Sequence, residues 1–295
     1  MSPGTPESEI EIDAGLVRSL LCDQHPDLAD HELVFFESGW DNSTFRLGDE
    51  LALRLPRREA AAQLILNEQR WLPELAARLP IPISAPLRVG RPSADYPWHW
   101  SVLPWLPGQT ANEASPNRDE ASRLASFLRA LHQPAPEDAP ENPFRGCALS
   151  KRAAPVEERL ARLRKKTDLI GPKVETAWRA ALGARESEER MWLHGDLHAR
   201  NVLVDRERIS GIIDFGDITA GDVATDLAAA WALFEDPSAR LRVLDEVNAD
   251  AATRCRARGW AVSFGAMLLD TGLVDHPRHA VMGERTLRRV AEDGF

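Results

Sequence analysis

The stretch of residues 192–226 reads WLHGDLHARNVLVDRERISGIIDFGDITAGDVATD. Short apolar runs alternate with tight turns in it, which predicts an apolar β-hairpin over residues 202–213. Asp196 lies in a glycine-containing loop before this hairpin, Asn201 opens its first strand, and Asp214 ends its second strand. A hairpin of this kind brings Asn201 and Asp214 to neighbouring strand ends.

These three side chains indicate a specific chemistry. An amide oxygen and a carboxylate at close quarters are typical ligands of Mg²⁺, a hard cation that prefers oxygen and phosphate. Asn201 and Asp214 are therefore the predicted metal ligands. Asp196, on the preceding loop, remains available to accept a proton.

Two strings in this stretch carry a resemblance to a known family. They are His194-Gly195-Asp196-Leu197-His198-x-x-Asn201 and Ile213-Asp214-Phe215-Gly216-Asp217. Their order and spacing resemble the aminoglycoside phosphotransferase and choline kinase superfamily, which has a protein-kinase-like fold. The resemblance implies that Asp196 is the catalytic base, that Asn201 and Asp214 bind Mg²⁺, and that ATP or GTP is the phosphoryl donor.

The rest of the chain fits an α+β, bilobal protein-kinase-like fold, with an N-terminal antiparallel sheet lobe and a mostly helical C-terminal lobe. Strands are expected at 32–37, 43–47, 51–55 and 98–103, and helices at 14–22 (capped by Asp13), 60–79 (kinked or interrupted at Pro73), 118–132, 155–166, 173–182, 224–234, 239–247 and 259–268. The helices at 155–166 and 173–182 are expected to be exposed. We place the lobe boundary at Gly108, giving a nucleotide-binding lobe over 1–108 and a catalytic and acceptor-binding lobe over 109–295, with 1–12 as a disordered leader.

The phosphates of the nucleotide need a loop that covers them. Residues 38–44, SGWDNST, resemble the nucleotide-positioning loop of the family, and Ser43 and Thr44 are its candidate phosphate contacts. An ordinary hairpin loop is the alternative. The kinase template also needs a cation paired with a helix glutamate. Arg54 stands where lysine is usual, and Glu68 is its expected partner.

The resemblance further implies that the nucleotide base sits against residues 103–108, LPWLPG. Pro104 would supply a backbone carbonyl and Leu106 a backbone N–H group. Proline cannot donate but can accept. This stretch does not distinguish ATP from GTP.

Among the other polar residues of the stretch, a structural role is favoured for His194, and His198 either lies near the phosphates or is a plain loop residue. Asp217 and Asp222 either face the acceptor pocket or cap helices. Asp226 is expected to brace the loop that carries Asp196, as the corresponding family aspartate does.

Composition narrows the class of protein. The 295 residues are 43% hydrophobic and 28% charged, which is typical of a globular protein. A formal net charge of −10 argues against nucleic-acid binding, and no apolar run is long enough for a membrane span or resembles a secretory signal. Three widely spaced cysteines indicate reduced thiols in a cytoplasmic protein, which we expect to be a monomer or a homodimer.

The acceptor is a hydroxylated small molecule in this interpretation. An aminoglycoside, a macrolide or a related antibiotic is the first choice, and antibiotic resistance the corresponding role; a metabolic amino-alcohol or sugar derivative is the alternative. The pocket should come from helical residues after Asp217 and the connector near 134–144. Trp231, Trp260 and Phe264 either line an apolar pocket or, as we favour, belong to the core. A nucleotide-binding pseudoenzyme stays open, and a protein kinase fits less well, because the segment 214–226 is short.

Overall fold

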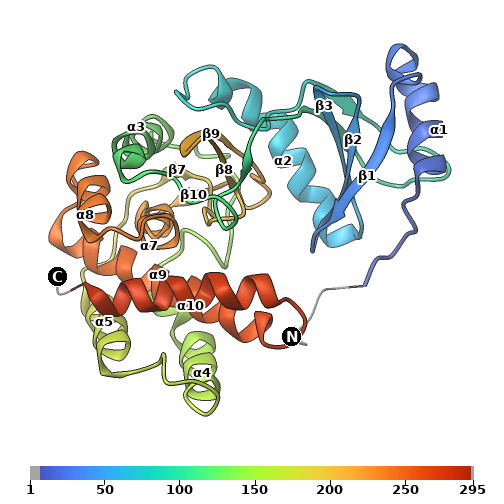
Figure 1. Ribbon diagram of the computed structural model, residues 1–295. Coiled ribbons are helices and arrows are strands. Elements are labelled where there is room, and N and C mark those ends of the chain that lie inside the picture. The colour runs from blue at the N-terminus through green and yellow to red at the C-terminus, as the bar shows by residue number, and fades with distance from the viewer. Residues whose placement is uncertain (1–6, 294–295) are drawn as a thin grey trace. The chain divides into compact units, whose positions relative to one another are not determined.

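The computed structural model describes residues 7–293 (Figure 1). The chain divides into two compact units, which are described separately. The sheet unit contains residues 7–107 together with Asp214–Gly216. The helical unit contains Gly108–Ile213 and the chain from Asp217 onwards.

A five-stranded antiparallel sheet forms the centre of the sheet unit, in the order β1-β2-β3-β5-β4. Its strands are β1 (Leu33–Ser38), β2 (Asn42–Leu47), β3 (Leu51–Pro56), β4 (Arg88–Gly90) and β5 (Trp100–Pro104). The four strands predicted from the sequence are confirmed to within two residues at each end. Tight turns join β1 to β2 and β2 to β3, so the first three strands form a meander.

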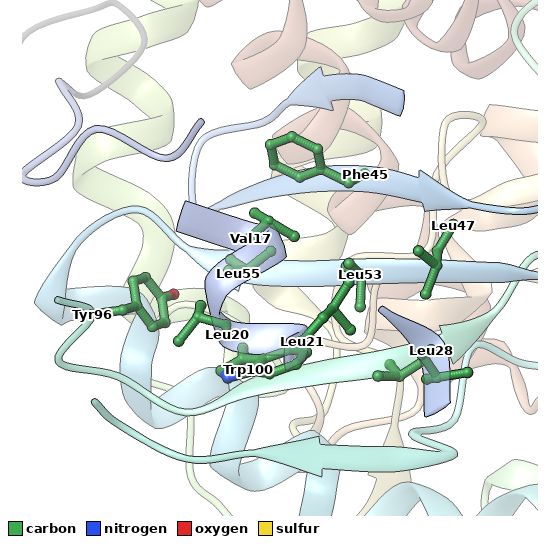
Figure 2. Close-up of a cluster of buried hydrophobic side chains, with 11 residues drawn as sticks. Val17, Leu20, Leu21, Leu28, Phe45, Leu47, Leu53, Leu55, Tyr96 and Trp100 are labelled. Atoms are coloured by element: carbon green, nitrogen blue, oxygen red, sulfur yellow. The ribbon is translucent and has the colours of Figure 1, made fainter. Parts of the chain in front are cut away.

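Helix α1 (Ala14–Gln24) covers one face of this sheet. Asp13 caps it by accepting a hydrogen bond from the N–H group of Leu16 at 2.8 Å, as predicted. Figure 2 shows the core that results, in which apolar side chains of α1 and of the 3-10 helix Pro26–Leu28 meet those of β2, β3 and the segment around Trp100. Leu53 and Leu55 of β3 point into this core and are fully buried.

Helix α2 (Glu59–Ala76) packs on the sheet through the other side of β3. Side chains alternate between the two faces of a strand, so Arg54, between Leu53 and Leu55, points away from the α1 core and meets Glu68 of α2. Of the two alternatives expected at Pro73, the interruption is wrong, because the helix continues through it, and the kink stays a prediction. Pro73 lies near the C-terminal end of α2, and the buried Leu72 and Leu75 hold the last turn against the unit.

The N-terminal segment is also more ordered than expected. Residues 1–6 of the expected leader lie outside the described residues. The backbone of Glu9 donates to the carbonyl of Arg57 at 2.9 Å, and its carboxylate accepts from the N–H group of Glu59 at 2.8 Å. Ile10 and Ile12 pack against the α1 core. The described part of the leader is therefore attached to the sheet unit.

Two small antiparallel sheets lie in the helical unit. One has the order β6-β8-β9, with β6 (Gln109–Thr110), β8 (Val202–Asp205) and β9 (Arg208–Ile212), and the other pairs β7 (Met191–Leu193) with β10 (Thr219–Gly221). The hairpin β8–β9 confirms the predicted one. The 194–201 loop, which we call the HGD loop, connects β7 to β8.

Helices make up most of the remaining unit. They are α3 (Ala121–Leu131), α4 (Ala153–Leu163), α5 (Pro172–Gly183), α6 (Ala224–Leu227), α7 (Ala229–Leu233), α8 (Pro237–Glu246), α9 (Ala251–Gly272) and α10 (Pro277–Glu292), with 3-10 turns at Arg118–Glu120 and Leu149–Arg152. The long helices α9 and α10 lie side by side (Figure 1). The predicted helix over 224–234 is split into α6 and α7.

The burial of this unit corrects one expectation and confirms another. Helices α4 and α5 are not simply exposed, since each buries an apolar stripe, with Leu160 and Trp178 among its members. Both helices pack against α9. Trp231, Trp260 and Phe264 are at most 6% exposed, which places them in the core as favoured.

None of the helices among residues 7–293 is both long and apolar enough to cross a membrane. The three cysteines, Cys22, Cys147 and Cys255, are free thiols.

The α1 core generates a stability prediction. Leu53→Ala removes a fully buried side chain and leaves a cavity, so it is expected to lower the free energy of unfolding by about 2–5 kcal/mol. Urea unfolding followed by tryptophan fluorescence measures this loss. Leu87→Ala, at a leucine that is 60% exposed, is the control and should change it by less than about 0.5 kcal/mol. Equal effects of the two substitutions would contradict the described core.

Candidate functional site

The HGD loop is held by a buried carboxylate. Asp226 of α6, which is 0% exposed, accepts hydrogen bonds from the backbone N–H groups of His194 at 2.8 Å and Gly195 at 2.9 Å. The Nε2 atom of His132 lies 3.2 Å from the same carboxylate. Asp226 therefore braces the loop, as the sequence predicted.

The backbone of the loop turns sharply at Gly195. Its φ is +85°, and a Cβ atom there would lie 2.3 Å from the carbonyl oxygen of Asp217. Both the dihedral angle and the close approach require glycine. His194 is fully buried, and its Nε2 atom lies 3.0 Å from the carbonyl oxygen of Ile213, which agrees with a structural role.

Asp196 follows this turn with its carboxylate between two basic side chains. Its Oδ1 accepts from Arg145 Nη2 at 3.1 Å, and its Oδ2 lies 3.3 Å from His198 Nε2. Burial by itself raises the pKa of Asp196, but the charges of His198 and Arg145 outweigh it and hold this pKa well below its usual range. Asp196 is thus a carboxylate at neutral pH.

Asn201 ends the loop and is almost completely buried. Its amide nitrogen donates to the backbone carbonyl of Asp196 at 2.9 Å, and its backbone N–H donates to the backbone carbonyl of His198 at 2.9 Å. The first bond uses the nitrogen and fixes the amide, so the amide oxygen is the atom that would coordinate a cation.

In the sheet unit, Arg54 bridges two carboxylates. It donates to Glu68 Oε1 at 2.8 Å and also to Asp214 Oδ1. Burial, together with the charge of Asp214, raises the pKa of Glu68 to about 7 although Arg54 opposes it. Burial lowers the pKa of Arg54, but the two carboxylates more than compensate and hold it above its usual value. The expected Arg54–Glu68 pair is present.

Asp214 has an unusual backbone and an accessible side chain. Its φ of +63° is in the left-handed region, which aspartate tolerates better than most residues and which is often found at functional sites. Its side chain is 51% exposed, even with Arg54 as a partner. It lies two residues beyond the end of β9 rather than at the end itself.

The predicted phosphate loop is shorter than expected. Ser43 and Thr44 are not in a loop, because both belong to β2 and pair with Ser38 and Glu37 of β1. Ser43 is 4% exposed, and its hydroxyl lies 2.8 Å from that of Ser38. Pairing with β1 and β3 extends the strand to Asn42 and leaves only residues 39–41 as the turn.

The expected base-binding residues lie at the end of β5. Pro104 is the last residue of that strand and faces Leu51 of β3. Trp105 follows and donates its backbone N–H to the carbonyl of Glu50 at 2.7 Å. Leu106 comes directly after this bond, in a segment outside the sheet. Whether Pro104 and Leu106 contact a nucleotide remains a prediction.

Sequence reasoning missed Arg145. Besides its bond to Asp196, its Nε atom lies 4.0 Å from Asp217 Oδ2, and its guanidinium stacks over the Phe264 ring at 4.9 Å. Asn142, three residues earlier, donates to Asp217 Oδ1 at 2.6 Å. The only signal in the sequence was the presence of these polar residues in the otherwise proline-rich connector.

Asp222 has a structural environment instead. It accepts from Arg256 at 2.6 Å and from the N–H group of Ala224 at 3.1 Å, so it caps the turn that begins α6. Its side chain is almost completely buried by these contacts.

The residues present fit a magnesium ion chemically. The amide oxygen of Asn201 and the half-exposed carboxylate of Asp214 are the hard oxygen donors that Mg²⁺ prefers. Neither string contains a thiol.

Comparisons with solved structures show the fold. The GDP complex of aminoglycoside 2'-phosphotransferase-IIIa matches with a TM-score of 0.69 and 17% identity, over 96% of this chain and 100% of that one. The apoenzyme of a macrolide 2'-phosphotransferase from Brachybacterium faecium matches with a TM-score of 0.62 and 21% identity, over 90% and 97%. A macrolide 2'-phosphotransferase type I matches with a TM-score of 0.61 and 22% identity, over 94% and 97%. At these identities the likeness shows the protein-kinase-like α+β fold.

No protein with a curated description matches the sequence. A family model described as the phosphotransferase enzyme family matches residues 32–260, which is more than three quarters of the chain and includes both the HGD loop and Asp214. The chain therefore belongs to the phosphotransferase enzyme family.

Proposed function

We propose that this protein transfers the γ-phosphate of ATP or GTP to a hydroxyl group of a small molecule. The observation that carries the proposal is the state of Asp196, an ionised carboxylate held on a braced loop by Arg145 and His198. Membership of the phosphotransferase family and the fold support it.

Asp196 would receive the acceptor hydroxyl. A carboxylate with a low pKa is a weak base, so its contribution is to orient the hydroxyl oxygen and to accept the proton late, as the O–P bond forms. Such timing suits phosphoryl transfer, whose loose transition state needs positioning and charge neutralisation more than early deprotonation.

Asn201 and Asp214 would hold Mg²⁺, which neutralises charge on the β- and γ-phosphates when it is bound. Arg54 would contribute a further positive charge to the phosphates. Arg54 already donates to the carboxylates of Glu68 and Asp214. Its planar guanidinium can donate two parallel hydrogen bonds, whereas the ammonium group of lysine would act as a point charge.

The acceptor class is open within this proposal. Aminoglycosides and macrolides are acceptors to test because the matching solved structures carry those names. Amino-alcohols and sugar derivatives are the metabolic alternatives.

A coupled ADP- or GDP-release assay with these acceptor panels tests the proposal. Acceptor-stimulated turnover is expected, and Asp196→Asn should lower it about 10²–10⁴-fold because the hydroxyl loses its proton acceptor. Asp214→Ala should abolish the magnesium dependence. Full turnover by Asp196→Asn would exclude Asp196 as the base, and nucleotide binding without stimulation by any acceptor would favour a pseudoenzyme.

The ionised state of Asp196 predicts a pH dependence of stability. Because its pKa is lower in the folded chain than in the unfolded chain, the unfolded chain binds more protons in acid. The stabilisation by Asp196 is therefore complete above its ordinary pKa of about 4 and is lost as the pH falls below it. Calorimetric Tm values from pH 7 to pH 3 should fall more steeply for the wild type than for Asp196→Asn. Parallel curves would contradict this assignment.

The bracing of the loop predicts a separate effect. Asp226→Asn removes one carboxylate oxygen from a site where two backbone N–H groups donate, so stability should fall by about 1.5–3 kcal/mol. Turnover should fall with it, through kcat more than through the KM for nucleotide. The exposed Asp205→Asn is the matched control and should change neither quantity. Wild-type turnover in Asp226→Asn would show that the loop needs no brace.

A further inference from the structure

The carboxylate of Asp196 is held by two donors and is still accessible. Arg145 Nη2 donates to its Oδ1 at 3.1 Å, and His198 Nε2 lies 3.3 Å from its Oδ2. The backbone N–H of Arg200 donates to His198 Nδ1 at 3.3 Å, so the ring proton of a neutral His198 is on Nε2 and faces Asp196. The Asp196 side chain is 22% exposed. Because a carboxylate oxygen has two acceptor positions, each oxygen keeps one for a ligand.

The guanidinium of Arg145 has one nitrogen that is both unbonded and accessible. Its Nη2 atom is bonded to Asp196. Its Nε atom is enclosed, and the Oδ2 atom of Asp217 lies 4.0 Å from it, which is too far for a hydrogen bond. Its Nη1 atom makes no hydrogen bond to residues 7–293, yet it does not belong to the enclosed side-chain atoms that lack a partner. Nη1 therefore keeps surface that a ligand atom can reach.

Both the side chain and the backbone of Arg145 are held by their surroundings. The guanidinium stacks over the ring of Phe264 at 4.9 Å. Gly146, the next residue, has a φ of +64° and donates its N–H to the hydroxyl of Thr225 at 3.2 Å. Its carbonyl accepts from the N–H group of Asp222 at 2.9 Å. The position of the guanidinium beside Asp196 is thus set by the protein before a ligand binds.

Asp196 and Arg145 together offer one acceptor and one donor to a ligand. Since Nη1 and Nη2 belong to one planar fork, an oxygen that accepts from Nη1 lies next to a hydroxyl that donates to Asp196 Oδ1. In the transfer, the reacting hydroxyl gives its proton to Asp196 and bonds to the γ-phosphorus as the bond to the nucleoside diphosphate breaks. A guanidinium that donated to the same oxygen would withdraw electron density from it and oppose the attack. The oxygen at Nη1 is therefore a second one.

We infer that the acceptor carries a second oxygen on the carbon next to the reacting hydroxyl, as in a 1,2-diol, and that Arg145 Nη1 donates to this oxygen. This inference rests on the proposed phosphotransfer and makes Arg145 a specificity-determining residue. A protonated amine on the neighbouring carbon has no lone pair to accept the bond and places a second cation beside Arg145, which selects against a 1,2-amino alcohol. Among the metabolic alternatives, sugar derivatives are therefore favoured over amino-alcohols.

Three cyclohexane derivatives test this preference by binding. The trans isomers of cyclohexane-1,2-diol and cyclohexane-1,4-diol differ only in the spacing of two equivalent hydroxyl groups, and trans-2-aminocyclohexanol replaces one hydroxyl of the 1,2-diol by an ammonium group. Saturation-transfer NMR with the full chain without nucleotide measures each Kd. One hydrogen bond to a charged group predicts a Kd about tenfold lower for the 1,2-diol than for either other compound. Equal Kd values, or no binding of the 1,2-diol, overturn the inference.

Substitutions locate the preference. Arg145→Met keeps most of the length of the side chain and removes its donors, so the two diols should bind equally. Arg145→Lys keeps the charge but not the planar fork, so most of the preference should be lost here too, even if Arg145→Met folds poorly. Arg288→Met, at an arginine of α10 that is paired with Glu284 at 2.7 Å, is the control and should keep the wild-type preference. A full preference in a folded Arg145 variant overturns the inference.

Nucleotide turnover with the same compounds separates this inference from the proposed function. The 1,2-diol should have the highest kcat/KM of the three. If it binds with an Arg145-dependent preference but neither it nor any acceptor of the panels stimulates turnover, the oxygen site stands and the phosphotransfer proposal fails. If the 1,4-diol or the amino alcohol is phosphorylated as well as the 1,2-diol, phosphotransfer stands and the inference is overturned. Phosphorylation of other acceptors without any of the 1,2-diol also overturns it.

Discussion

The carboxylate of Asp226 is the contact on which the helical unit's chemistry depends. It is completely buried, and burial of a charge is expensive unless hydrogen bonds compensate for it. Here the backbone N–H groups of His194 and Gly195 donate to it, so the charge is satisfied only when the HGD loop has its observed conformation. Other conformations of the loop would leave the buried carboxylate without these donors and are therefore disfavoured. The position of the Asp196 side chain follows from that geometry.

In the sheet unit, buried charge is compensated by ion pairs between one cation and two carboxylates. Arg54 is buried, and its partners Glu68 and Asp214 differ sharply in exposure. Glu68 is enclosed and has a raised pKa, whereas Asp214 is half exposed. Arginine suits this arrangement because its planar donors can serve two carboxylates at once. The exchange of lysine for arginine at this position is thus consistent with the local contacts.

Local strings predicted much of the fold and part of the candidate site. Asp196, Asn201, Asp214 and Asp226 lie in one stretch of 35 residues, where the turn at Gly195 and the apolar hairpin fix short-range geometry. The assignment of Ser43 and Thr44 to the 38–44 loop was wrong, because both pair with β1, in agreement with the strand predicted at 43–47. Their contact with phosphate stays a prediction. Pro73 does not interrupt α2, since burial of the neighbouring leucines outweighs one missing backbone donor.

The contact of Arg145 with Asp196 could not be predicted from the sequence pattern, because the position of Arg145 depends on backbone contacts between segments that are distant in the sequence. The connector that carries it is attached to β10 and the turn after it through main-chain carbonyls at Pro140 and Gly146. These bonds do not depend on the side chains at residues 141–145. The main-chain bonds of the segment would therefore persist when these side chains change, although Asn142 also accepts from the backbone N–H of Phe144. Under the proposed function, a directed library at residues 141–145 would vary the surroundings of Asp196 and Asp217 while the main-chain bonds at Pro140 and Gly146 are kept.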